Sequence, residues 1–198
     1  MKPDSRFWQP LIPERWDDFE ALLGPKGAYG GCWCMWWRTS RSQFDQQQGN
    51  DNRLAMKGIV DSGEIPGILL YEVNKPIGWC SVAPRENFAS LNRSRILKPI
   101  DHMAVWSIVC MYVAKDSRRK GIMLQIIRAA IEYVGENFGQ IIEAYPTIPK
   151  TGQLPPVSSY MGFPEVFKTA GFVECSRPSP SKLVMRYYLE PHNPSNPS

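Results

Sequence analysis

The sequence has few of the residues on which metal sites depend, and it lacks several patterns that would mark other function classes. It contains two histidines and five cysteines in 198 residues, with no Cys-x-x-Cys pair of the kind that binds zinc. No basic run is interleaved with aromatic residues, which argues against nucleic-acid binding. No hydrophobic run reaches membrane-spanning length. We therefore expect no metal, no nucleic-acid partner and no membrane partner.

The cysteines are too few, and odd in number, for a disulfide framework. They lie mostly in apolar surroundings, so we expect free thiols in a reducing cytosol. Met1–Pro10 has no continuous apolar core of the kind found in signal peptides, and we expect a cytoplasmic protein. Cys32, Cys34 and Cys80 leave open a thiol-based metal or redox protein, although packing thiols explain the Cys-x-Cys spacing better.

What the chain does contain is enough apolar sequence for one substantial core. Hydrophobic residues make up 43% and charged residues 21%, and the net charge of +4 is mild and compatible with an anionic cofactor. We expect a single domain over residues 1–189 and a disordered tail over residues 190–198.

Hydrophobic periodicity predicts strands that alternate with helices. The expected strands are Phe7–Leu11, Gly67–Val73, Pro76–Ala83, Val105–Val113, Gln140–Tyr145, Phe172–Ser176 and Lys182–Leu189. The expected helices are Glu14–Leu23, a second from Asn50 or Asp51 to about Asp61, Gly121–Asn137 and Phe163–Ala170. Together they predict a mixed α/β sheet.

The most informative stretch is Val105–Met123, VWSIVCMYVAKDSRRKGIM. It has the pattern of a buried strand, a tight polar turn, a glycine and a helix. The free N–H groups of a helix start, together with the side chains of Arg118, Arg119 and Lys120, can hold a phosphate or pyrophosphate group. Gly121 lets the backbone approach such an anion. The stretch therefore predicts a phosphate-bearing cofactor.

With this turn in place, the order of elements resembles the Gcn5-related N-acetyltransferase (GNAT) superfamily. That family carries Arg/Gln-x-x-Gly-x-Gly/Ala before a helix, matched here by Arg118–Met123, and an aromatic residue after a later glycine, matched by Gly171-Phe172. The resemblance covers Phe7–Leu189 in topology, and its motifs occupy Val105–Phe172. It implies a mixed, mostly antiparallel sheet that is splayed at its centre and flanked by about four helices.

The resemblance implies acetyl-CoA, or another acyl-CoA, as the donor. The pantetheine arm would pair with the backbone of Met111, Tyr112 and Val113, and a backbone N–H of that strand would bind the acyl carbonyl. The pyrophosphate would lie on the turn and the helix start, at Arg118, Arg119, Lys120, Gly121, Ile122, Met123 and Leu124.

Two residues depart from the family pattern. Met123 replaces a small residue, so either the backbone lies farther from the pyrophosphate or the Met side chain points away. Phe167, which we also expect at the cofactor site, stands where many members have a tyrosine that protonates the departing thiolate. Phenylalanine cannot donate a proton, so the acid comes from elsewhere or is not needed.

Three residues are candidates for proton transfer. Glu143, in the strand after the long helix, is a candidate general base, directly or through water; the alternative is an ordinary strand carboxylate. Tyr145 and Tyr160 are candidate acids, or half-buried aromatic residues. Tyr145 lies two residues from Glu143, so both side chains can share one face. An acyl-cysteine at Cys110 is conceivable, but no histidine lies nearby to activate it, and a small buried hydrophobe is the favoured interpretation.

The Trp-rich segment Cys32–Arg38 belongs to the region that lines the acceptor pocket in the family's topology. Trp36 and Trp37 could enclose an amine and Arg38 could bind a carboxylate, or the segment could be a core plug. We thus expect an N-acetyltransferase that moves an acetyl group directly from acetyl-CoA to a primary amine of a small molecule or peptide. The alternative is a non-catalytic acyl-CoA sensor, and the sequence leaves a homodimer open.

Overall fold

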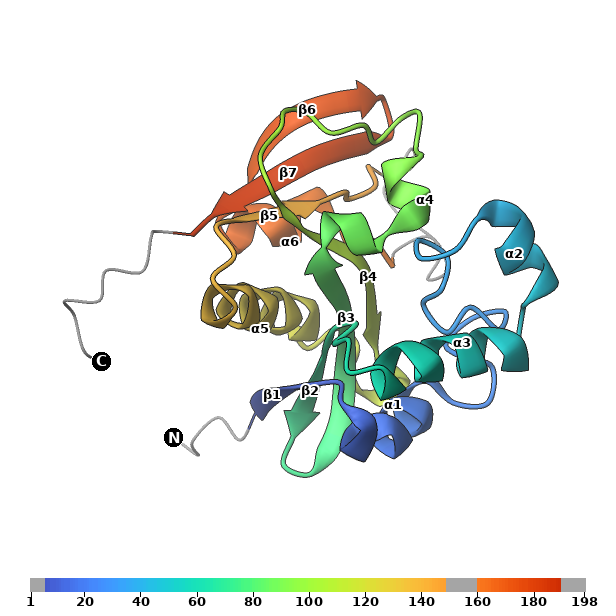
Figure 1. Ribbon diagram of the computed structural model, residues 1–198. Coiled ribbons are helices and arrows are strands. Elements are labelled where there is room, and N and C mark those ends of the chain that lie inside the picture. The colour runs from blue at the N-terminus through green and yellow to red at the C-terminus, as the bar shows by residue number, and fades with distance from the viewer. Residues whose placement is uncertain (1–5, 149–159, 190–198) are drawn as a thin grey trace, which may run out of the picture.

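A seven-stranded mixed sheet forms the centre of the protein in the computed structural model, which describes residues 6–148 and 160–189. Its strand order is β1-β2-β3-β4-β5-β7-β6. Strands β5, β6 and β7 run across the top of the molecule and β1 to β4 lie below them (Figure 1). The strands are β1 Arg6–Pro10, β2 Ile68–Glu72, β3 Lys75–Pro84, β4 Trp106–Val113, β5 Ile141–Ala144, β6 Val173–Ser179 and β7 Lys182–Tyr188.

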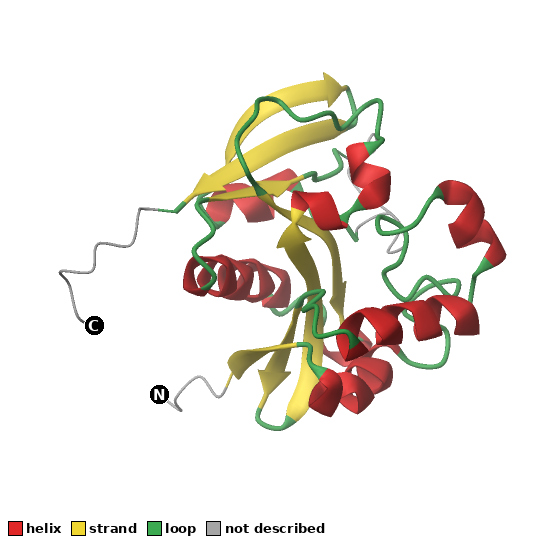
Figure 2. Cartoon of the chain, in the orientation of Figure 1, coloured by secondary structure: helices red, strands yellow, loops and turns green. Residues whose placement is uncertain are grey.

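Helices cover both faces of this sheet (Figure 2). The α-helices are α1 Trp16–Leu23, α2 Arg41–Gln46, α3 Asn50–Asp61, α4 Ala89–Asn92, α5 Ile122–Glu136 and α6 Pro164–Thr169. Three 3-10 turns accompany them, at η1 Pro13–Arg15, η2 Arg85–Asn87 and η3 Lys115–Ser117. Within the described ranges, no helix is both long enough and apolar enough to cross a membrane.

Side-chain alternation along the strands divides the core between the two faces. On one face, Ile68, Leu70 and residues of β3 and β4 pack against α5 and α6. On the other, Leu69 and Tyr71 pack with the aromatic residues of α1 and the 33–35 segment. A third cluster lies under α4, where β3, β4 and β7 meet the Tyr145 ring.

The centre of the sheet opens between β4 and β5, the one parallel pair among the described strands. Their paired stretch runs only from Trp106 and Ile142 to Ile108 and Ala144. On that side β4 continues to Val113 without a described strand beside it, and its pairing with β3 shifts register between Cys110 and Ile108. Such irregularities bend a strand and often lie next to active sites. The splayed sheet that the sequence predicts is therefore confirmed.

Most predicted elements are present, but the described residues form six α-helices where the resemblance implies about four. Helix α2 lies in a stretch where no helix was expected; its signal is the capping box in which Ser40 and Gln43 bond each other's backbone N–H groups. Helix α3 begins after Gly49 (φ 89°) with no side-chain cap, so neither Asn50 nor Asp51 caps it. The predicted tail at 190–198 lies outside the described residues.

Two glycine substitutions test the packing of this sheet. A Cβ at Gly67 would lie 2.0 Å from the backbone oxygen of Cys80, whereas a Cβ at Gly58, inside α3, meets nothing within 4 Å. We expect Gly67→Ala to lower the unfolding free energy by about 2 kcal/mol or more. Gly58→Ala should raise it by about 0.5–1 kcal/mol through helix propensity. Urea unfolding measures both; equal effects would contradict the close approach at Gly67.

Candidate functional site

The turn between β4 and α5 presents three cations to solvent. Arg118, Arg119 and Lys120 are exposed, and the Nε of Arg118 donates to the backbone oxygen of Val113 at 3.0 Å, which fastens the turn to the end of β4. The Arg118 guanidinium also lies 5.8 Å from the centre of the Tyr112 ring. The turn is thus a charged surface with a fixed attachment to the strand.

The backbone of this turn is held in conformations that aim N–H groups outward. Gly121, the residue before α5, has φ 74°, and Arg119 has φ 61°, a left-handed value that costs a residue with a side chain about 1 kcal/mol. The first turn of an α-helix leaves its N–H groups without intrahelical partners. A Cβ at Gly121 would meet nothing within 4 Å, so the space before the helix is open. This combination suits an anion.

Met123, one of the two departures from the family pattern, packs against the hydrophobic core under α5. Its neighbour Ile122 is buried, while Leu124 is half-buried. Because the Met123 side chain is directed to the core, it does not fill the space in front of the helix start. A methionine at this position is therefore compatible with an anion at the turn.

Strand β4 turns backbone hydrogen-bonding groups toward the gap beside β5. The N–H of Met111 donates to the carbonyl oxygen of Tyr160 at 2.6 Å, so the chain at Tyr160 lies against the open side of β4. Backbone N–H groups alternate in direction along a strand, and the N–H of Val113 therefore points the same way as that of Met111. On the open side of β4 the Met111 N–H is therefore already bonded, and the Val113 N–H is a second donor two residues farther along the strand.

Glu143 is buried at the centre of a hydrogen-bonded network. Arg186 donates its Nε to the carboxylate oxygen Oε1 at 2.9 Å, and Arg85 Nη1 donates to Oε2 at 3.1 Å. The Tyr145 hydroxyl donates to Oε2 at 2.7 Å, so the two side chains share one face of the strand, as their spacing predicts. Both carboxylate oxygens are thus occupied, and Glu143 is 1% exposed.

The network extends to neighbouring elements and balances its charges. Arg186 also binds Asp101 with both Nη groups, and Arg85 Nη2 donates to the Leu97 carbonyl at 2.6 Å. Two guanidinium groups therefore face two carboxylates. The Arg186 contact, together with a backbone hydrogen bond from Met103, lowers the pKa of Asp101 to about 2.

The Tyr145 hydroxyl has no free hydrogen-bonding direction toward a substrate. It accepts from Arg85 at 2.7 Å, and because its own proton goes to Glu143, Ser107 Oγ is the donor in their 2.8 Å contact. Burial, with the adjacent Glu143 charge, raises the pKa of Tyr145 well above its ordinary value. The ring is fully buried. These contacts favour a structural role for Tyr145 over the predicted acid.

Phe167 and Tyr160 lie on the other side of the gap. Phe167 is fully buried, and its ring packs edge-on against Phe172 at 5.0 Å between ring centres. Tyr160 is half-buried, and burial raises the pKa of its hydroxyl. A Cβ built on Gly162 would touch both Phe167 and Met111, so the three residues meet at one point. Phe167 thus packs where the chain closes against β4.

The Trp-rich segment is largely committed to internal contacts. Arg38 is 9% exposed and donates to Glu64 Oε1 at 2.7 Å and to the Pro66 carbonyl at 3.1 Å, with its guanidinium 4.8 Å from the centre of the Phe88 ring. The half-buried Trp36 packs edge-on against Phe44 and carries the Arg41 guanidinium 4.4 Å from its ring centre. Trp37 is half-buried beside the cluster under α4. The contacts of Arg38 leave it poorly placed to bind a carboxylate.

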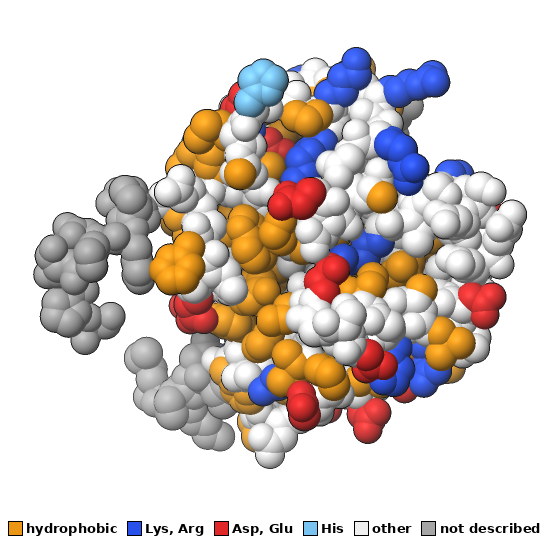
Figure 3. Space-filling view, viewed as in Figure 1, with side chains coloured by type: hydrophobic (Ala, Val, Ile, Leu, Met, Phe, Trp, Pro, Cys, Tyr) orange, Lys and Arg blue, Asp and Glu red, His pale blue; other side chains and the backbone are white. Residues whose placement is uncertain are grey.

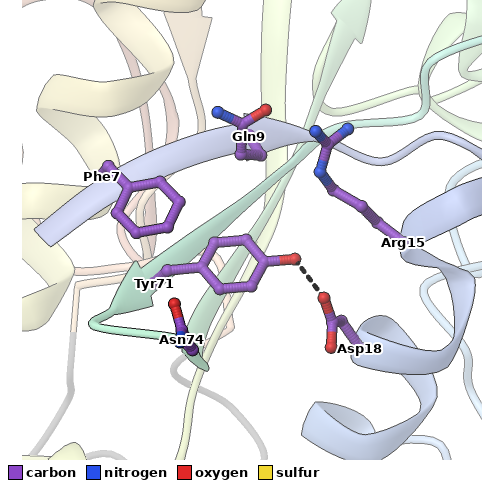
Figure 4. Close-up of a pocket in the computed structure, with 6 residues that line it drawn as sticks. All are labelled: Phe7, Gln9, Arg15, Asp18, Tyr71 and Asn74. Carbon is purple, nitrogen blue, oxygen red and sulfur yellow. Dashed lines mark hydrogen bonds between the residues drawn. The ribbon is translucent and has the colours of Figure 1, made fainter.

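Two shallow hollows lie elsewhere on the surface. The first has a volume of about 390 Å³, and Figure 4 shows Arg15 and the hydrogen-bonded pair Tyr71 and Asp18 around it, together with Phe7, Gln9 and Asn74. The second, of about 400 Å³, is lined by β1 and the end of α5. Neither is lined by any of the predicted site residues.

The described residues contain no group of three or more His, Cys, Asp or Glu side chains placed to hold a metal ion. On the face in Figure 3, Lys and Arg side chains lie at several separate places, with Asp and Glu side chains among them. That face therefore carries no single continuous basic surface.

The structure places a cationic helix start beside the point where β4 and β5 separate. Comparison with known proteins identifies a family. The sequence profile described as "Acetyltransferase (GNAT) family" matches residues 30–148, more than half of the chain. The chain belongs to this family. It is therefore a GNAT N-acetyltransferase, which transfers an acetyl group from acetyl-CoA to an amine. A comparison with curated protein sequences found no match.

Solved structures of GNAT proteins share the fold at low sequence identity. A GNAT-family acetyltransferase from Streptococcus agalactiae 2603 is 12% identical, with a TM-score of 0.56, over 93% of this chain and 96% of its own. The PaiA N-acetyltransferase from Thermoplasma acidophilum, in complex with coenzyme A, is 12% identical, with a TM-score of 0.52, over 93% and 99%. The NatC complex bound to Gag peptide and CoA is 11% identical, with a TM-score of 0.53, over 94% and 99%.

The sequence predicted Glu143 and Tyr145 but not the network of side chains that encloses them. Arg85, Ser107 and Arg186 come from three different elements, and Asp101 from the loop before β4. The only sequence signal is an arginine within an otherwise apolar strand, Arg186 in KLVMRYY. A charge in such a strand needs a buried counter-charge, but the sequence does not say which one.

Removing the central charge should destabilise the fold of this acetyltransferase. In Glu143→Gln the amide NH₂ replaces one carboxylate oxygen and would face a donor in either orientation: Arg85 and Tyr145 in one, Arg186 in the other. Arg85 would also lose its carboxylate partner. We expect the unfolding free energy to fall by about 3 kcal/mol, the usual cost of breaking a buried ion pair. Urea unfolding measures it, with the exposed Glu136→Gln as the control. A loss below about 1 kcal/mol, ordinary for surface pairs, would contradict the network.

Proposed function

We propose that the protein binds acetyl-CoA with its pyrophosphate on the turn 118–121 and the first turn of α5, and with its pantetheine arm along the open side of β4. The acetyl group then passes directly to a primary amine of a small molecule or a peptide. The observation that carries this proposal is the cationic turn with Gly121 in the left-handed conformation, fastened to β4 at Val113. An anion and an extended amide chain fit these two adjacent features.

The open side of β4 offers the hydrogen bonds that the pantetheine amides need. The Val113 N–H points into the gap, whereas the Met111 N–H is held by the Tyr160 carbonyl. Pairing with Met111 therefore requires the Tyr160 carbonyl to move away. Once free, the Met111 N–H can bind the acyl carbonyl and stabilise the oxyanion that forms there.

Direct transfer needs a neutral amine, a positioned thioester and a route for two protons. The amine attacks the thioester carbonyl, the C–S bond breaks, and the CoA thiolate takes a proton. Glu143 is enclosed by two arginines, which supports a positioning role: it holds β4, β5 and β7 in register beside the gap. The amine proton is then lost through water rather than directly to Glu143.

Among the predicted proton donors, Tyr160 is supported best. Its carbonyl lies on the Met111 N–H, so the residue stands at the gap, and its hydroxyl stays protonated because burial raises its pKa. Tyr145 is enclosed by Glu143, Arg85 and Ser107. We therefore assign the protonation of the CoA thiolate to Tyr160.

The acceptor is proposed only as a primary amine. Trp36 and Trp37 are both half-buried, so each keeps exposed ring surface that a ligand could contact. The Arg38 guanidinium binds Glu64, so the expectation of a carboxylate-bearing acceptor loses its support. The NatC structure holds a peptide with CoA, and on the same fold a peptide amine fits the proposal as well as a small molecule. A homodimer and a cytoplasmic location stay predictions.

The first experiment measures cofactor binding at the turn. Acetyl-CoA and CoA should raise the apparent melting temperature and ATP should not, because a ligand that binds only the folded state stabilises it. Release of free thiol with a panel of amines should then accompany acetyl transfer. Binding without thiol release from any amine would favour the non-catalytic sensor.

Substitution at the turn should weaken this binding. We expect Arg119→Ala and Lys120→Ala each to raise the dissociation constant for acetyl-CoA about 5- to 50-fold, since each removes a charged contact to the pyrophosphate. Titration calorimetry measures it. Arg128→Ala, an exposed change farther along α5, should bind as the parent does. Unchanged affinity in the two turn variants would refute the pyrophosphate assignment.

Removing the Tyr160 hydroxyl should slow the chemical step. We expect Tyr160→Phe to lower kcat about 10²-fold, the usual contribution of a general acid, with little change in KM for acetyl-CoA. Steady-state thiol release measures both constants. Tyr29→Phe, a change at a 66% exposed tyrosine, is the control. If both variants keep the parent kcat, thiolate departure needs no acid from Tyr160.

A further inference from the structure

Four of the five cysteines gather beside the gap in the sheet, and two of them touch. The Sγ atoms of Cys34 and Cys110 lie 3.3 Å apart, although the residues are separated by 76 positions in the sequence. Cys110 belongs to β4, directly before Met111, at the point where the strand pairing shifts register. Cys32 and Cys80 lie close enough to Cys34 to interact with its charge.

The surroundings of the two touching thiols differ. The Sγ of Cys34 accepts a hydrogen bond from the indole Nε1 of Trp79 at 3.2 Å. The contact with Cys110, the Trp79 bond and the Arg38 charge lower the pKa of the Cys34 thiol. The pKa of the Cys110 thiol is raised by the same contact and by burial. Of the two thiols, Cys34 is therefore the one that ionises more readily, and Cys110 lies beside it at hydrogen-bonding distance.

Access and backbone geometry fit a reactive pair. Cys110 is half-buried, so the pair borders the surface through this residue, whereas Cys34 is 4% exposed. Trp33 and Cys34 have φ values of 46° and 57°, a rare left-handed conformation for two consecutive residues with side chains. The backbone thus holds the Cys34 sulfur against β4 at a conformational cost.

We propose that Cys34 and Cys110 are a modification site for hydrogen peroxide, at which oxidation forms a reversible disulfide between the 32–38 segment and β4. The sulfurs stand about 1.3 Å beyond the bonded distance of about 2.0 Å, so a small movement of the 32–38 segment closes the bond. Cys80 and Cys175 lie outside the pair; Cys80 is fully buried and Cys175 is exposed.

The two steps balance in atoms and electrons. The Cys34 thiolate attacks one peroxide oxygen and the O–O bond breaks, which gives Cys34 sulfenic acid. The departing hydroxide takes the proton that the Cys34 thiol released on ionising and leaves as water. Cys110 then attacks the Cys34 sulfur, the S–S bond forms, the S–O bond breaks, and the departing hydroxide takes the Cys110 proton as water. Two thiols are oxidised, one peroxide is reduced and two waters form. A dithiol reductant reverses the modification.

The disulfide would affect acetyl transfer if the proposed site is correct, and this consequence rests on the proposed function. It would fix the Trp-rich segment to the strand residue that precedes Met111. Closing the S–S bond would draw Cys110 toward Cys34 and displace the neighbouring Met111 N–H, to which we assign the acyl carbonyl. We expect the oxidised protein to lose most of its transfer activity and to regain it on reduction.

The test uses the full-length protein in a Cys175→Ser background, treated with a small excess of hydrogen peroxide and digested without reduction. Peptide mass spectrometry should find Cys34 linked to Cys110, with Cys80 still a thiol. In Cys110→Ser the disulfide should be absent and Cys34 should carry a sulfenic acid, which dimedone added together with urea traps once the chain unfolds. In Cys34→Ser neither product should form. Circular dichroism confirms that each variant is folded.

Several results would overturn the proposal. These are a Cys32–Cys34 link in place of Cys34–Cys110, oxidation of Cys32 alone, or both thiols unmodified when free methionine in the same tube is oxidised. Peptide mass spectrometry detects the disulfide whether or not the protein is catalytically active. If the disulfide forms in a protein that shows no acetyl transfer, the modification site stands and only its link to the proposed function is refuted. A disulfide that leaves full activity would refute that link as well.

Discussion

The arrangement of this protein depends on one buried carboxylate. Glu143 lies in the middle strand of three neighbours, with Ser107 of β4 on one side and Arg186 of β7 on the other. A buried guanidinium without a charged partner would cost several kcal/mol, so Arg85, whose carboxylate partner is Glu143, requires this residue in place. Arg186 binds both Glu143 and Asp101. A parallel pair of only three residues has few backbone hydrogen bonds, and the side-chain network joins β5 to its neighbours where the ladder stops.

The network around Glu143 also explains how the sheet stays folded although β4 and β5 separate. The network fixes β4 and β5 at their first residues, and beyond Ile108 no described strand pairs with β4 on that side, where Met111 instead binds Tyr160. Its open N–H groups and the cationic turn before α5 are consecutive in the chain, so a single segment supplies both an extended amide edge and an anion site. A molecule with a pyrophosphate at one end and amides along its length, as coenzyme A has, complements this order.

The same gap brings together groups with different chemistry. Tyr160, Met111 and Phe167 close it from one side, and Cys110 and Cys34 meet on the opposite face of β4, where the strand pairing shifts. Alternation along the strand separates them: Met111 faces the core under α5, and Cys110 faces the Trp-rich segment. A change at the thiol pair is therefore one residue away from the proposed acyl-binding N–H.

The sequence by itself determined the order of strands and helices, the turn from Arg118 to Gly121 and the family, because hydrophobic periodicity, glycine placement and local charge are properties of neighbouring residues. It also placed Glu143 and Tyr145 on one face of a strand. Only the tertiary structure decided what those side chains do. Arg85 and Arg186 reach Glu143 from distant elements, and Asp101 binds Arg186. Arg38 likewise pairs with Glu64, and Cys34 lies against Cys110. Such long-range pairing depends on how the sheet is assembled and leaves no periodic pattern in the sequence.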